Sequence, residues 1–103
     1  MPKPLEGLNS QVFREQLHTQ FKVQTGAQPL QLELIEVTDS NESPKMECFS
    51  LYLRGPIKPR LEQKIHRLEH EQLGEFEIFL TAVSGDAQGT VYESVFHRFR
   101  KQP

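Results

Sequence analysis

Apolar and polar residues alternate with a period of two along most of this chain, as in half-buried β-strands. The clearest case is residues 76–83, where Phe76, Ile78 and Leu80 fall on one face and Phe79 on the other. The same alternation predicts further strands over residues 17–23, 30–37, 46–54, 64–70 and 91–99. About six short strands separated by turn residues predict an all-β fold, a small antiparallel barrel or sandwich.

Two segments depart from this period. Val12, Phe13 and Leu17 share a helical face behind Ser10, which predicts a short N-terminal helix capped by Ser10. In the second segment, residues 30–34 are apolar in one phase and residues 35–37 in the other. Either a β-bulge near Leu34 or a central strand buried on both faces would explain that change.

Turn residues separate the predicted strands. We expect turns or loops at residues 26–29, 39–44 and 84–89, and an irregular connection over residues 56–63. Residues 58–73 also fit a helical spacing, but a strand from Lys64 is favoured because Gly74 and another strand follow at once. The in-phase apolar positions of the clearest strands are the expected core: Phe49, Leu51, Leu53, Ile78, Leu80 and Phe96.

The length of 103 residues suits one domain with a single core. We assign residues 10–100 to this domain, residues 1–9 to a mobile lead and residues 101–103 to a tail. The start of the chain lacks the apolar run of a signal peptide, and no stretch approaches the ~18 apolar residues of a membrane span. These features predict a cytoplasmic protein without membrane contact; release within a larger particle stays open.

Charge is arranged in alternating segments. Acids dominate residues 30–50 and 68–93, whereas residues 51–67 carry five bases and one acid, and the last ten residues carry three bases. Antiparallel strands of opposite charge would pair across the sheet, or would join copies of the domain edge to edge. The bases of the middle segment form the basic band, the expected interaction surface: Arg54, Lys58, Arg60, Lys64 and Arg67.

No catalytic or metal-binding pattern stands out. His66 and His70 would lie about 13 Å apart on a strand at ~3.3 Å per residue, too far to share one ion. Single Cys48 excludes an internal disulfide and a multi-thiolate zinc site. We therefore expect no metal, no cofactor and no enzymatic activity, and we expect these histidines to bond backbone groups or to lie at the surface.

Three motifs carry a resemblance to a known family. Residues 49–56 (FSLYLRGP), residues 68–74 (LEHEQLG) and residues 91–96 (VYESVF) resemble an uncharacterised family of bacterial domains of about this length. The chain departs from the family pattern at Leu53, at Ser94 and at the tyrosine expected near Ile65. The resemblance implies an accessory place beside phage-tail-like collar and fibre proteins, and it implies no site residues.

These observations predict a structural or protein-interaction module that binds a partner or itself through an edge strand and the basic band. Such association should weaken with salt and with charge reversal at Arg60 and Lys64. The alternative is a small barrel that binds a ligand or single-stranded nucleic acid through residues 54–67. The acidic segments on either side would repel phosphate, so nucleic acid is the less expected partner.

Overall fold

The computed structural model describes residues 9–25, 28–40, 46–58 and 60–99, with the side chains of 40, 46, 47 and 97–99 left out. The expected lead, apart from Asn9, and the expected tail lie outside these residues. The chain forms one short helix and six strands: α1 Ser10–Arg14, β1 Gln20–Val23, β2 Leu30–Ser40, β3 Met46–Gly55, β4 Lys64–His70, β5 Gly74–Asp86 and β6 Gly89–Phe99.

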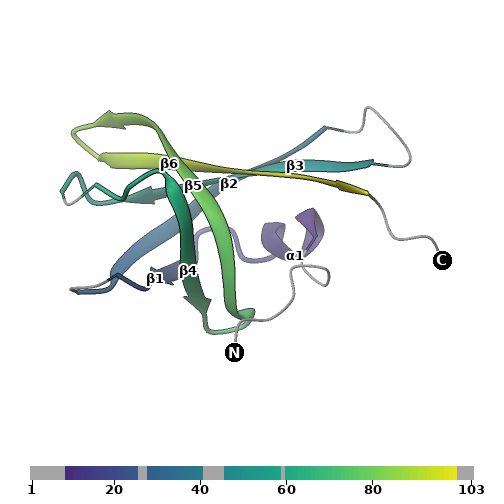
Figure 1. Ribbon diagram of the computed structural model, residues 1–103, viewed down its shortest axis with the longest axis horizontal. Helices are drawn as coiled ribbons and strands as arrows, with labels where there is room; N and C mark the ends of the chain where they lie inside the picture. Colours follow the sequence, from purple (N-terminus) through teal and green to yellow (C-terminus); the bar gives the residue numbers. More distant parts are fainter. Residues whose placement is uncertain (1–8, 26–27, 41–45, 59, 100–103) are drawn as a thin grey trace.

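The strands form one antiparallel sheet that closes on itself in the order β1-β2-β3-β6-β5-β4 (Figure 1). The all-β prediction is confirmed, and the choice between barrel and sandwich is decided for a closed sheet. The expectation of an open sheet with a free strand along each edge is wrong, because β1 pairs with β4.

The closed sheet is not quite a barrel, because two of its seams are incomplete. β1 pairs with β4 only at Lys22↔Glu69 and Val23↔Leu68. β5 pairs with β4 over its first half, and its listed pairing with β6 starts only at Thr81↔Glu93. Unpaired strand edges are therefore local features of the described chain.

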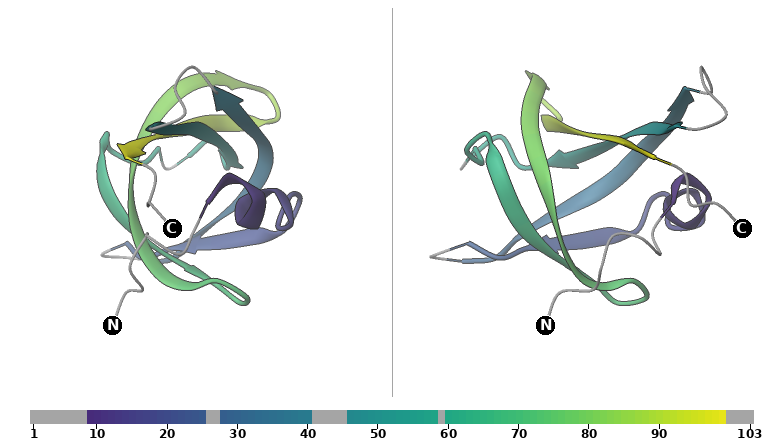
Figure 2. Two further views of the ribbon diagram at one scale, coloured as in Figure 1. Left: turned by 90° about the vertical axis from the view of Figure 1, so that its right-hand side faces the viewer. Right: turned by 45° about the vertical axis from the view of Figure 1, so that its right-hand side comes forward.

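Phe13 of α1 fills the interior at one end of the sheet. Its ring centroid lies 5.8–6.5 Å from those of four aromatic residues on four different strands, Phe21, Phe49, Phe76 and Phe96. The end-on view in Figure 2 shows α1 across this opening. A five-residue helix cannot persist alone, so the burial of Phe13 is what holds it.

The helix begins one residue earlier than predicted and ends sooner. Asn9, not Ser10, is the N-cap, and its Oδ1 accepts a hydrogen bond of 2.9 Å from the Val12 backbone. Residues 15–18 form turns rather than helix or strand. His18 adopts a positive φ of 67° there, and its backbone N–H donates to the Leu34 carbonyl at 2.7 Å.

The predicted strand pattern is otherwise confirmed, with one shorter turn. The β-bulge lies where the phase changes, between Leu34 and Glu36. Residues 64–70 form a strand rather than a helix, and Gly74 has a φ of 81°. β5 and β6 extend into the expected loop 84–89 and leave a turn of two residues, Ala87 and Gln88.

The predicted core residues are all buried, with exposed fractions of 7% or less. Phe79 and Val83, which fall in the opposite phase of the same strand, are exposed at 47% and 48%. Among the described residues no helix has the length and apolar character required to span a bilayer.

Candidate functional site

A groove of about 730 Å³ opens beside β4, where β1 ends. One side comes from the end of β1 and the start of β2, with Gln24, Thr25, Gln28 and Leu30. The other side comes from the connection before β4 and from β4 itself. Its residues are Arg60, Leu61, Glu62, Lys64, Ile65, His66 and Arg67.

The groove exists because β1 is shorter than the strand that it pairs with. The last backbone bond between the two, from the Gln24 N–H to the Arg67 carbonyl, is 2.9 Å long. The backbone N–H and C=O of one residue point to the same side of a strand, and the side alternates along the chain. Those of Ile65 therefore face the groove, as those of Arg67 do, and no described strand pairs with them.

Two buried hydrogen bonds hold the connection that forms the groove wall. The Leu61 N–H donates to the hydroxyl of Tyr92, a core residue of β6, at 2.9 Å. His66 is buried below the groove, and its Nε2 lies 2.7 Å from the Glu62 carbonyl, to which it must donate. These contacts fix the backbone on either side of Arg60 and Glu62.

The groove carries more positive than negative charge. Arg60, Lys64 and Arg67 line it together with a single acid, Glu62. Lys64 forms an ion pair with Glu62 at 3.6 Å, and both side chains are largely exposed, so this pair contributes little to stability. Arg60 and Arg67 have no ion pair within 4 Å among the described residues.

Exposed apolar side chains lie next to these cations. Ile65 is 62% exposed on β4 and lies directly across from Phe79 on β5. Arg67 is the cross-strand neighbour of Glu77 in the same ladder. The outward face of the β4–β5 pair thus offers an apolar pair beside a pair of opposite charges.

The structure divides the predicted basic band. Arg60, Lys64 and Arg67 come together in the groove. Arg54 lies on β3 between Glu33 of β2 and Val91 of β6, and Lys58 is exposed in the connection without lining the groove. The second basic segment, residues 97–101, falls outside the described side chains.

The charge alternation along the sequence produces the expected neighbours across the sheet. Arg54 faces Glu33, Arg67 faces Glu77, and Lys22 forms an ion pair with Glu69 at 3.5 Å. A second hollow of about 460 Å³ lies over the β1–β4 seam, and Lys22, Glu69 and Glu71 are among its lining residues. Its one cation is already paired, so it offers an anionic partner less than the groove does.

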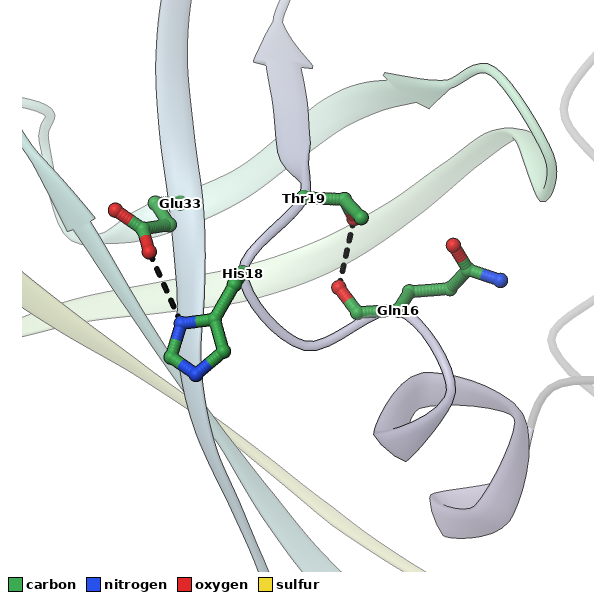
Figure 3. Close-up of polar contacts among 4 residues, drawn as sticks. All are labelled: Gln16, His18, Thr19 and Glu33. Carbon is green, nitrogen blue, oxygen red and sulfur yellow. Dashed lines mark hydrogen bonds and ion pairs between the residues drawn. The ribbon is translucent and has the colours of Figure 1, made fainter.

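His70 bonds backbone groups, as predicted, and it does so inside the fold. Its Nδ1 accepts hydrogen bonds from the N–H groups of Gln72 and Leu73, at 3.0 and 3.2 Å. Its Nε2 must then carry the proton and donates to the Thr19 hydroxyl at 2.8 Å. Thr19 passes its own proton on to the Gln16 carbonyl at 2.7 Å (Figure 3).

His18 lies in the same turn but points outward. Its Nδ1 is 3.1 Å from Glu33 on β2, as Figure 3 shows. No three metal-ligating side chains come together in the part of the chain that the structure describes. The register places His97 opposite half-buried Cys48, and neither hollow is lined by Cys48.

Sequence reasoning missed the β1–β2 side of the groove. Gln24, Thr25, Gln28 and Leu30 belong to a turn with no charge and no chemical motif. Their role follows only from the pairing of β1 with β4, segments about 45 residues apart in the chain. A short strand before a Gly-Ala-Gln-Pro turn is the one local signal, and it does not identify the partner strand.

A family model described as a domain of unknown function, DUF6916, matches residues 8–96. No curated protein matches the chain. No solved structure matches it either.

Proposed function

Because the chain belongs to the DUF6916 family, a domain of unknown function, its role has to be argued from its own surface, and we propose that it is a non-enzymatic protein-interaction module. One observation carries the proposal: the groove combines an unpaired strand edge, an exposed apolar side chain and cations without acidic partners. Ile65 provides the first two, and Arg60 and Arg67 provide the charge.

The partner that fits is an extended protein segment with acidic and apolar side chains. Its backbone would bond to the groove-facing N–H and C=O of Ile65, as in recognition by strand addition. Its carboxylates would lie beside Arg60 and Arg67, and an apolar side chain would cover Ile65 and Phe79. Main-chain bonds would supply affinity, and the alternating side chains would supply specificity.

The setting we propose is an accessory part of a phage-tail-like or fibre assembly. This part of the proposal rests on the resemblance of residues 49–56, 68–74 and 91–96 to bacterial domains found beside collar and fibre proteins. A small domain that docks through one strand edge suits such an assembly, because each contact needs only a local match of backbone and charge.

Photo-crosslinking in the native host tests the module. A photoreactive amino acid in place of Ile65 should capture a protein partner, whereas the same group at Glu36, exposed on β2, should not. Charge reversal by Arg60→Glu and Arg67→Glu should abolish the capture without unfolding the protein. Equal capture from both positions, or capture that survives charge reversal, would contradict a specific groove partner.

A second candidate is an anionic ligand or single-stranded nucleic acid, since three cations line the groove. Binding of single strands usually adds stacking on exposed aromatic residues, and Phe79 is the half-exposed aromatic side chain nearest to the groove in the described chain. Fluorescence anisotropy with a labelled oligonucleotide separates the two candidates. Salt-sensitive binding that Arg60→Glu removes would favour nucleic acid over an acidic peptide.

A further inference from the structure

A second unpaired strand edge lies on β5. Residues 74–80 pair with β4 on one side, and pairing with β6 starts only at Thr81↔Glu93 on the other. Over residues 74–80 the side of β5 turned away from β4 has no strand partner among the described residues. Figure 1 shows β5 and β6 diverging from their shared hairpin.

The outward side chains of β5 already match those of β4 within one molecule. Phe79 faces Ile65, and Glu77 faces Arg67, across the β4–β5 ladder. Phe79 and Ile65 are both about half exposed or more, so each retains apolar surface for another contact. Residues 68–93 carry six acids and no base, which makes this edge the acidic complement of the groove.

The backbone groups of the two edges also match. Ile65 and Arg67 direct their N–H and C=O toward the groove and hence away from β5. Residues opposite each other in an antiparallel pair either exchange hydrogen bonds or both point away. Phe79 and Glu77 therefore direct their backbone groups away from β4, toward the open edge of β5.

We propose that the open β5 edge of one copy adds to the groove-side β4 edge of a second copy, with Phe79 and Glu77 of one beside Ile65 and Arg67 of the other. This inference rests on the proposed interaction function and names the partner as the chain itself. The two edges differ, so the contact is head-to-tail, and it produces a ring if the rotation closes and an open filament if it does not.

Two variants block one edge each and leave the β4–β5 ladder intact. Ile65→Pro removes the N–H that faces the groove, and Glu77→Pro removes one on the open edge of β5; proline is tolerated where its missing N–H faces outward. Ile65→Arg and Phe79→Arg form a second pair that changes only exposed side chains. Val83→Arg, at an equally exposed apolar site of β5 where it pairs with β6, is the matched control.

Sedimentation velocity on the purified full chain decides the proposal. The wild type and the control should associate, and each blocked variant alone should weaken association at least about tenfold in Kd, or about 1.4 kcal/mol. An equimolar mixture of the two blocked variants should form a dimer and nothing larger, because one head and one tail remain.

Three results would overturn the head-to-tail contact: a wild-type monomer at high concentration and low salt, a variant of Glu77 or Phe79 that associates normally, or a mixture that stays monomeric. Circular dichroism excludes variants that fail to fold. If the wild type is monomeric while the probe at Ile65 still captures a foreign protein, the interaction module stands and self-assembly fails.

Discussion

At the scale of single residues, His70 is the clearest link between distant parts of the chain. It ties the β4–β5 turn, through Gln72 and Leu73, to Thr19, 51 positions earlier. Burial lowers the pKa of this imidazole from its ordinary value of 6.5, and the nearby Glu71 carboxylate opposes that shift. A protonated Nδ1 could not accept the two N–H groups, so the neutral form fits the fold.

The stability of the domain should therefore fall in mild acid. With the folded pKa below 6.5, the unfolded chain binds more protons, so the contribution of His70 is complete above pH 6.5 and is lost as pH falls toward the folded pKa. Urea unfolding at pH 8 and pH 5 should show this loss, and His70→Gln should lose less between these two pH values. An identical pH slope for both proteins would contradict the role of His70.

Gly89 is required by both conformation and space. Its φ is +138°, and a Cβ there would lie 2.2 Å from the Gly55 carbonyl oxygen. Gly89→Ala should cost about 1–3 kcal/mol of the free energy of unfolding, because the backbone cannot yield without strain. Gly85→Ala is the control, since its Cβ would meet the nearest atom at 3.5 Å. Equal stability of the two variants in urea unfolding would show that the turn adapts.

At the scale of elements, β5 has one buried and one exposed face. Leu80 is fully buried, whereas its neighbour Phe79 is 47% exposed. Leu80→Ala should cost ~2–5 kcal/mol in chemical unfolding. Phe79→Ala, which loses one cross-strand contact with Ile65, should cost about 1 kcal/mol or less. A loss under 1 kcal/mol for Leu80→Ala would contradict the assigned core face.

The connection before β4 depends on Tyr92. Tyr92→Phe leaves the buried Leu61 N–H without its acceptor, which should cost about 1–3 kcal/mol and speed hydrogen exchange at Leu61. Tyr52→Phe is the matched control, because that hydroxyl donates to Glu93 on the outward face of the sheet. If Leu61 exchanges equally slowly in both variants, other contacts position the groove wall.

At the scale of the whole molecule, opposite charges lie at two different strand edges. Attraction between exposed charges is screened beyond about 8 Å at 0.15 M salt. Self-association should therefore weaken from low to high ionic strength, and Arg60→Glu with Lys64→Glu should weaken it further. Arg54→Glu is the control, since Arg54 lies outside the groove; an equal effect of that variant would mean that net charge, not the groove, controls association.

Much of the fold was readable from local pattern. Period-two alternation identified the buried faces of β3 and β5, and the change of phase after Leu34 identified the bulge. Gly74 identified a turn with positive φ. These features were accessible because each depends on residues close in sequence, whose side chains point alternately to two faces of one strand.

The N-terminal segment shows where local pattern fails. Leu17 continued the alternation of Phe21 and Val23, yet it lies in a turn. The backbone bonds of His18 and Thr19 to Leu34 fix that turn against β2. A helix of five residues and its turn are too short to determine their own structure, so contacts with the sheet decide it.

The sequence by itself determined the fold class, most strand positions and the side of each clear strand that faces the core. Only the tertiary structure decided that β1 meets β4, that a groove forms beside Ile65, and that Arg60, Lys64 and Arg67 share it while Arg54 and Lys58 do not. The reason is physical: alternation specifies which face of a strand is buried, whereas the choice of partner strand depends on registers between distant segments, which no local pattern contains.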